Sequence, residues 1–157
     1  MAWATQQYSR NRIDEAGRCI VDPSASREER ELALVVVNNW RSTHAFPLNT
    51  FQMTLRQRSR RFDSDALIAQ RLKRLPSIET KLQRFHGMKL SRMQDLGGCR
   101  SVVSDVKAVD QLFDFYTNAR FDHPLKRQDD YLRGPQATGY RGIHLVYAYA
   151  GAAGEYR

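Results

Sequence analysis

Hydrophobic residues recur every three or four positions through much of the chain, which predicts a series of amphipathic helices. Ser26 and Glu29 form a capping box that starts the first helix near Arg27, and this helix should end before Pro47. Ser77 has the residue type and position expected of the N-cap of a later helix. The expected helices span residues 27–46, 50–61, 64–75, 78–85 and 106–118.

The later part of the chain changes to patterns typical of strands. Val102 and Val103 follow a glycine pair and suit a short buried strand. Side chains of Ile143–Ala150 alternate between two faces, and we predict another strand near His123–Gln128. Helices followed by strands mixed with one helix indicate an α+β domain, in which helices flank a small mixed β-sheet.

The length of 157 residues suggests one domain. Residues 1–25 are polar, and we expect a loosely structured segment there, with one short helix, before a domain at residues 26–157. Residues 151–154 are typical of a turn into a returning strand, and the sequence stops three residues later. We interpret this as a fragment whose domain is incomplete at its C-terminus.

Positive charge is concentrated in one part of the chain. The chain carries 25 basic and 17 acidic residues, but residues 41–100 hold 13 basic and four acidic ones. Such a segment favours phosphate-rich partners, although an ordinary solvated surface is the alternative. Cys19 and Cys99 have no metal-ligand spacing, and the N-terminus lacks an apolar signal core. We therefore expect reduced thiols and a cytoplasmic location, with no membrane association.

A cluster of cations surrounds the predicted helix start at Ser77. Arg71 and Lys73 precede this start, and Lys81 follows one helical turn later on the same side as Ser77. Arginine and lysine side chains, a hydroxyl and free N–H groups together suit a polyphosphate. The alternative is a basic surface with an ordinary helix cap.

A carboxylate and a glycine pair precede the strand at Val102. Asp95 stands just before Gly97 and Gly98, and Arg100 follows at the strand start. A carboxylate on a rigid strand, with glycines that let a ligand approach, is suited to holding Mg²⁺. The alternative is that Asp95 caps a turn that the glycines shape.

The glycine-rich segment 119–142 is typical of a binding loop. Tyr140 follows Gly139 in this loop and offers a ring on which a base can stack. His144 comes next on the predicted strand. Either side chain could instead be structural, as a packing tyrosine or a satisfied histidine.

Together these three groups resemble the synthetase domain of RelA/SpoT alarmone enzymes over about residues 65–150. The matching motifs are Arg71-x-Lys73-x-x-x-Ser77-Ile78-x-x-Lys81, Asp95-x-x-Gly98-x-Arg100 and Asp130-Tyr131-x-x-x-Pro135-x-x-x-Gly139-Tyr140-x-x-x-His144. The resemblance implies a nucleotidyltransferase-like fold and transfer of pyrophosphate from ATP to the 3′-hydroxyl of GDP or GTP.

The resemblance also implies roles for the motif residues. ATP would be held by four of them: Arg71, Lys73, Ser77 and Lys81. Asp95 would bind the cofactor Mg²⁺ and, with Arg100, serve catalysis. Tyr140 would stack on the acceptor guanine beside Gly139, and His144 would place the acceptor phosphates.

Two departures from the family pattern bear on activity. Gln136 stands where the family usually has lysine, which removes a cation from the acceptor side. The Glu-x-Gln-x-Arg pattern that carries the family's catalytic glutamate does not occur in the sequence, so we expect that this chain could be inactive. The sequence also has no His followed directly by Asp, the pair that the family's hydrolase domain uses, which favours synthesis without hydrolysis.

Three functions stay open at this point. The first is an alarmone synthetase that uses ATP and GDP or GTP. The second changes the acceptor to the 3′ end of tRNA, as in toxic relatives, with an antitoxin protein as a further partner. The third is a non-catalytic nucleotide- or RNA-binding module. A homo-oligomer is compatible with each.

Overall fold

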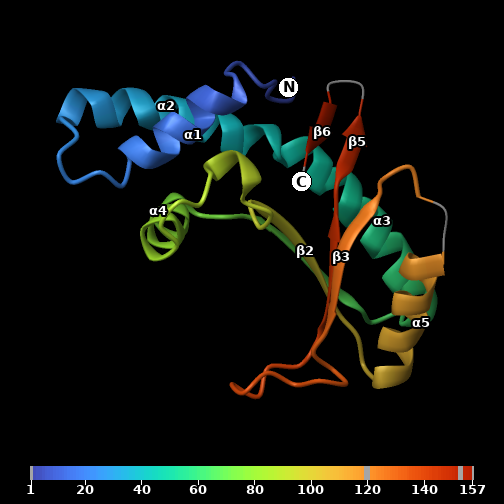
Figure 1. Cartoon of the computed structure of the whole chain (residues 1–157). Helices are drawn as coiled ribbons and strands as arrows, with labels where there is room; N and C mark the ends of the chain where they lie inside the picture. The colour runs from blue at the N-terminus through green and yellow to red at the C-terminus, as the bar shows by residue number, and fades with distance from the viewer. Residues whose placement is uncertain (1, 119–120, 152–153, 157) are drawn as a thin grey trace. The chain divides into compact units, whose positions relative to one another are not determined.

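The computed structural model describes residues 2–118, 121–151 and 154–156, which form helices and short strands (Figure 1). The helices are α1 (Arg10–Cys19), α2 (Arg27–Thr43), α3 (Ala45–Phe62), α4 (Leu75–Arg84) and α5 (Val106–Asn118), with a 3₁₀ turn at Leu90–Arg92. The strands are β1 (Leu67–Leu72), β2 (Gly97–Val102), β3 (Leu125–Asp130), β4 (Ile143–Tyr147), β5 (Tyr149–Gly151) and β6 (Gly154–Tyr156). The predicted α+β class is confirmed.

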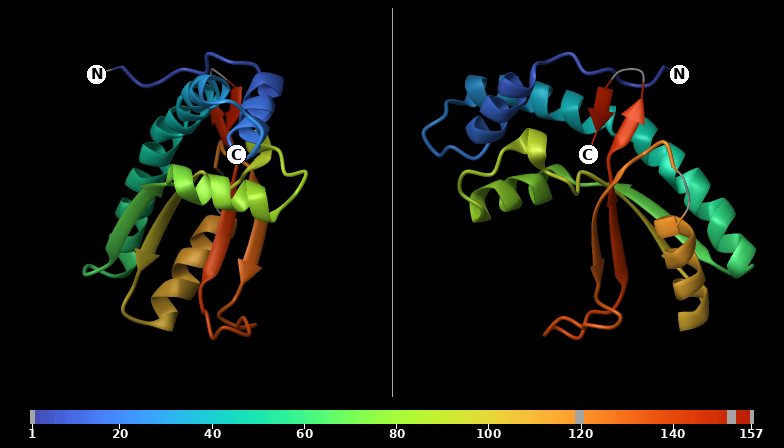
Figure 2. Two further views of the ribbon diagram at one scale, coloured as in Figure 1. Left: turned by 90° about the vertical axis from the view of Figure 1, so that its left-hand side faces the viewer. Right: turned by 45° about the vertical axis from the view of Figure 1, so that its right-hand side comes forward.

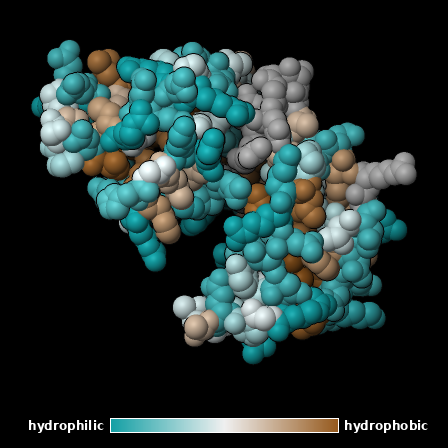
Figure 3. All heavy atoms as spheres, viewed as in Figure 1, coloured by the Kyte–Doolittle hydropathy of each residue, from teal (hydrophilic) through white to brown (hydrophobic). Residues whose placement is uncertain are grey.

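The described strands pair two by two, β1 with β2, β3 with β4, and β5 with β6. The chain divides into two compact units. The first unit comprises Met1–Thr54 and Ile68–Arg100, and the second comprises Leu55–Leu67 and Ser101–Arg157. Hydrophilic side chains cover most of the face drawn in Figure 3. No helix in the described part of the chain is long and apolar enough to cross a bilayer.

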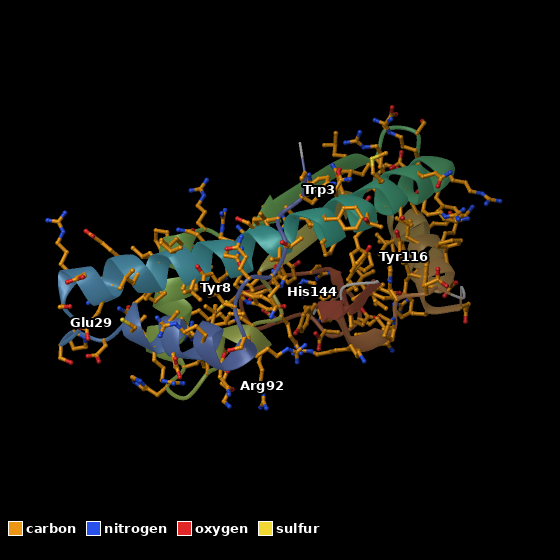
Figure 4. The ribbon with its side chains drawn as sticks, turned by 90° about the horizontal axis from the view of Figure 1, so that it is seen from above. Trp3, Tyr8, Glu29, Arg92, Tyr116 and His144 are labelled. Atoms are coloured by element: carbon orange, nitrogen blue, oxygen red, sulfur yellow. The ribbon has the colours of Figure 1, made fainter. Side chains whose placement is uncertain are left out.

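Helices α1 and α2 pack side by side in the first unit (Figures 1 and 2). The capping box predicted for α2 is present, because the Ser26 hydroxyl accepts from the Glu29 N–H and the Glu29 carboxylate accepts from the Ser26 N–H. Glu29 lies at the first turn of α2 in Figure 4. Helix α1, which falls in the segment expected to be loose, buries Ile13 completely. Its apolar face therefore anchors this polar segment to the unit.

Helix α3 begins at Ala45, five residues before the predicted start at Thr50. The prediction treated Pro47 as a barrier between helices. Pro47 instead lies in the first turn of α3, where its missing N–H leaves no helical hydrogen bond unmade.

The predicted helix at residues 64–75 is wrong, because Leu67–Leu72 forms β1. Ile68 and Leu72 are half-buried and the other four residues of β1 are exposed, with Leu67 at 70%, so the strand follows from its backbone pairing with β2 and not from an alternating burial pattern. The N–H of Lys73 donates to the carbonyl of Leu96 at 2.7 Å, which holds the end of β1 beside the start of β2.

The predicted N-cap at Ser77 is also wrong. Arg74 is the N-cap residue of α4, Pro76 lies in the first turn, and the N–H of Ser77 donates to the carbonyl of Arg74 at 3.0 Å. Pro76 was expected to separate a helix ending at Leu75 from one starting at Ser77; it lies instead in the first turn of α4, where the fixed φ angle of proline suits a helix start. Ser77 keeps its position one turn before Lys81.

The second unit is built on the antiparallel ladder of β3 and β4, in which Asp129 pairs with His144 and Asp130 with Ile143 (Figure 2). Half-buried rings from α3, α5 and β4 pack together, because Phe115 contacts Phe62 and Tyr116, and Tyr116 contacts Tyr147. The strand predicted near residues 123–128 is present at Leu125–Asp130.

The predicted strand at residues 143–150 is divided into β4 and β5. Ala148 separates them and is fully buried, and its N–H donates to the carbonyl of Pro124 at 3.0 Å. The predicted returning strand is β6, which pairs antiparallel with β5, while the turn at residues 152–153 lies outside the described residues.

Candidate functional site

The first unit brings three of the predicted site residues into direct contact. Lys73 lies just after β1, Lys81 lies on α4, and Asp95 lies two residues before β2. The Nζ atom of Lys73 is 2.9 Å from Oδ2 of Asp95, and Nζ of Lys81 is 2.7 Å from Oδ1. Both carboxylate oxygens are therefore engaged by ammonium groups that come from separate elements of the fold.

This cluster is partly shielded from water. The side chain of Lys73 is 11% exposed and that of Asp95 is 48% exposed. Burial raises the pKa of Asp95, but the hydrogen bonds and charges of Lys81 and Lys73 outweigh this effect and leave the pKa below its usual value. Asp95 is therefore ionised at neutral pH and neutralises part of the lysine charge.

A shallow hollow opens over the cluster along α4. It is lined by Lys73, Ser77, Thr80, Lys81, Arg84 and Phe85. Arg84 follows Ser77 at seven residues on the same helical stripe, so its place could be predicted from spacing. Thr80 and Phe85 were missed as site residues; Thr80 follows Ser77 at three residues, which is the same signal, whereas no motif singled out Phe85.

The two arginines of the predicted site lie on neighbouring strands. Arg71 is on β1 and Arg100 on β2, and both side chains are exposed to solvent. Gly98 is exposed, and a Cβ added there would meet no atom within 4 Å, so the fold itself does not require glycine at this position.

Tyr140, His144 and Tyr131 form a cluster in the second unit, which we call the ring cluster. The hydroxyl of Tyr140 lies 2.8 Å from Nε2 of His144, and their ring centroids are 5.5 Å apart. Tyr131 was part of the motif but was given no role from the sequence. Its ring packs edge-to-face with that of His144, with the ring centroids 5.2 Å apart. Gly139 has φ +79°, a left-handed conformation that favours glycine, and it turns the chain just before Tyr140.

The ring cluster has the chemistry of a base-binding platform. Tyr140 is 40% exposed, and the contact with His144 limits how its ring can turn. A tyrosine held in this way presents a π face to which a nucleobase can bind without first ordering the side chain.

The candidate ligand for Mg²⁺ in the first unit is the carboxylate of Asp95. Within the described residues there is no group of three or more His, Cys, Asp or Glu side chains that could hold a metal ion. Mg²⁺ is, however, commonly held by one or two carboxylates together with substrate phosphates. Asp95 would supply such a carboxylate if phosphate oxygens completed the coordination, although both of its oxygens contact lysines in the structure.

Comparison with protein families identifies the chain. The model described as a region found in RelA / SpoT proteins matches residues 70–156. The chain belongs to the RelA/SpoT family. All the motif residues from Arg71 to His144 fall within this match, whereas no curated protein matches the chain.

Solved structures share the fold of this RelA/SpoT chain. Small alarmone synthetase 2 from Bacillus subtilis superposes with a TM-score of 0.61 at 23% identity, over 71% of this chain and 60% of that one. Small alarmone synthetase 1 from the same organism, bound to its product pppGpp, superposes with a TM-score of 0.58 at 24% identity, over 74% of this chain and 66% of that one. A GTP pyrophosphokinase family protein from Streptococcus pneumoniae superposes with a TM-score of 0.60 at 22% identity, over 83% of this chain and 65% of that one. The chain thus spans 60–66% of the length of these structures.

Proposed function

We propose that this chain transfers the β,γ-diphosphate of ATP to the 3′-hydroxyl of GDP or GTP. The observation that carries the proposal is the convergence of Lys73, Lys81 and Asp95 within a RelA/SpoT family match. Lys73 and Lys81 line a hollow together with Ser77, and Asp95 contacts both lysines; these groups are suited to a polyphosphate and a divalent cation.

On the ATP side, the two lysines supply the charge. Lys73 and Lys81 would bind phosphate oxygens as point charges, and Ser77 would donate its hydroxyl from the first turn of α4. Arg71 would add a guanidinium from β1. Mg²⁺ would be held by Asp95 together with phosphate oxygens, and when bound it neutralises charge on the transferred group.

On the acceptor side, the ring cluster would receive the guanine. Tyr140 would stack on the base, and His144 would act both on Tyr140 and on the acceptor phosphates. The related small alarmone synthetase 1 has been solved with pppGpp, which supports a guanine nucleotide as the ligand class. Gln136 makes this side less positive than a lysine would.

The proposed reaction breaks one bond and forms one. The acceptor O3′ attacks the β-phosphorus of ATP, the bond from that phosphorus to the α,β-bridging oxygen breaks, and AMP leaves. Since the Glu-x-Gln-x-Arg pattern is not in these 157 residues, we assign no residue here as the base that takes the hydroxyl proton. Positioning and charge neutralisation are the contributions that the described residues can make.

The proposal is tested with the whole chain, Mg²⁺, ATP labelled in the γ-phosphate, and GDP, GTP or deacylated tRNA as the acceptor. Transfer by a chain that lacks the Glu-x-Gln-x-Arg pattern would give labelled guanosine 3′-diphosphate products together with AMP. Label in tRNA but not in nucleotide would identify tRNA as the acceptor in place of GDP or GTP. Formation of ADP, or binding of both nucleotides without transfer, would refute a pyrophosphotransferase and favour a kinase or a binding module, respectively.

A further inference from the structure

Arg133 joins the loop that follows β3 to helix α5. One terminal nitrogen of its guanidinium lies 2.6 Å from Asp110 on α5, and the other lies 2.6 Å from Asp130 at the end of β3. The forked guanidinium is the side chain that can hold two carboxylates at once. None of the motifs assigned a role to Arg133 or Asp110.

The loop thus anchored is the one that presents the ring cluster. Asp130 also accepts from the N–H groups of Leu132 and Arg133, both at 3.0 Å, and so shapes the first turn of the loop. The N–H of Tyr131 donates to the carbonyl of Gly142 at 2.8 Å, which closes the loop at its base. Farther along the loop, the N–H of Gln136 donates to the carbonyl of Tyr140 at 3.3 Å, and the N–H of Gly139 donates to the carbonyl of Gln136 at 2.8 Å.

We propose that Arg133 is a positioning residue, which holds Tyr131, Tyr140 and His144 in their mutual arrangement by tying their loop to α5. The inference rests on the proposed function only in naming the guanine nucleotide as the ligand that this arrangement serves. Arg133 itself stays outside the ring cluster, so its effect passes through the loop backbone.

The connectivity distinguishes this contact from an ordinary surface ion pair. Arg133 is 56% exposed and Asp110 is 40% exposed, so each pair alone contributes little. Their importance comes from joining two elements: Asp110 belongs to α5, whose Tyr116 ring stacks on Phe121, and Asp130 is the last residue of β3, where the loop begins. By contrast, the ion pair of Arg27 with Glu31 lies within α2 and connects no two elements of the fold.

The first test needs no nucleotide. Hydrogen exchange of the Gln136 and Gly139 amides and the ring-proton NMR shifts of His144 are measured in the wild-type chain, Arg133→Gln and Asp110→Asn. We expect exchange to accelerate about threefold to tenfold in both variants, with a changed His144 signal, because one or two exposed ion pairs are lost. The double variant should add little to either single change, since both remove the same connection. Arg133→Lys should restore part of the protection.

The second test uses GDP and an ATP analogue. If charge alone mattered, Asp110→Asn would remove a negative charge and so strengthen the binding of GDP, which is an anion. A positioning role predicts the opposite, that GDP binding by Asp110→Asn is weaker by about threefold to tenfold. Asp114→Asn, the same change one turn along α5, is the matched control and should leave GDP binding at or above the wild-type level. ATP-analogue affinity should not change.

The outcomes separate the inference from the proposed function. Unchanged exchange and an unchanged His144 signal in Arg133→Gln would overturn the positioning role, whatever the chain binds. Faster exchange without any GDP binding by the wild-type chain would retain the positioning role and refute the guanine nucleotide as its ligand. Tighter GDP binding in Asp110→Asn would overturn positioning in favour of simple charge.

Discussion

Replacing Asp95 by asparagine should strengthen the binding of polyphosphate in the absence of metal. In the structure both oxygens of Asp95 hold the ammonium groups of Lys73 and Lys81, so phosphate must compete with this carboxylate for the same cations. Asp95→Asn keeps the shape of the side chain and removes the competing charge. A residue that served only as a metal ligand would give no such gain.

The size of the gain follows from the exposure of the pairs. An exposed ion pair contributes about 0.2–1 kcal/mol. Lys73 is largely shielded and Lys81 is 28% exposed, which places both contacts toward the upper end. Releasing two lysines therefore predicts about 1–2 kcal/mol, or roughly a fivefold to thirtyfold lower dissociation constant for metal-free tripolyphosphate.

The assay is calorimetric titration with tripolyphosphate and with ATP, each in EDTA and in Mg²⁺. We expect Mg²⁺ to strengthen ATP binding by the wild-type chain, and to strengthen it much less in Asp95→Asn, because the variant lacks the carboxylate. Glu28→Gln, an equal charge change at an exposed position on α2, is the matched control and should behave like the wild-type chain. Equal or weaker metal-free binding by Asp95→Asn would refute the competition.

Three further predictions concern other parts of the chain. Gly17→Ala should lower the free energy of unfolding by about 1–2 kcal/mol in chemical denaturation, because its Cβ would come within 2.7 Å of Leu90 Cβ in the core. Tyr140→Phe should weaken GDP binding about twofold to tenfold in titration, since the ring remains while its contact with His144 is lost. Burial lowers the pKa of His44, so folding favours the neutral ring. The resulting stability is present above about pH 6.5 and is lost as the pH falls, with a slope of up to about 1.4 kcal/mol per pH unit. Denaturation of His44→Gln at a series of pH values should show that this slope is removed.

Matched changes serve as controls for these predictions. Gly98→Ala should cost little stability, because nothing lies within 4 Å of its added Cβ. Tyr8→Phe should leave GDP binding unchanged, and His86→Gln, at an exposed position, should keep the slope of stability against pH. A stable Gly17→Ala variant, equal GDP affinity in Tyr140→Phe, or an unchanged slope in His44→Gln would each contradict the corresponding reasoning.

The helices with strong terminal signals were predictable from the sequence. The capping box of Ser26 and Glu29 starts α2 at Arg27 as expected, and Asp105 accepts from the N–H of Ala108 at the start of α5. These signals are local, since the side chain that caps the helix lies within three residues of the group it satisfies.

The region from residue 63 to 77 was mispredicted because its local hydrophobic pattern favours a helix. Leu67, Ile68, Leu72 and Leu75 are spaced as on one face of a helix, yet β1 forms because its backbone pairs with β2 about thirty residues later. That partner is set by tertiary structure and is invisible to a local pattern. Pro76 reinforced the error, because the same proline either ends a helix or begins one.

The site was predictable as a set of residue types but not as a set of contacts. Motif spacing singled out Lys73, Lys81 and Asp95, but it did not reveal that Asp95 is held by both lysines across 22 and 14 residues of sequence. Likewise, Tyr140 and His144 were singled out separately, and their hydrogen bond emerged only from the turn at Gly139 and the register of β3 with β4.

The proposed division of roles is that the first unit binds the polyphosphate donor and the ring cluster of the second unit binds the acceptor base. Its most direct test is titration of Lys81→Met and Tyr140→Ala with Mg²⁺ and a non-hydrolysable ATP analogue, and separately with GDP. We expect Lys81→Met to lose analogue affinity and keep GDP affinity, and Tyr140→Ala to lose roughly fivefold to a hundredfold in GDP affinity and keep analogue affinity. Equal losses of both ligands in either variant, or no loss in both, would contradict it.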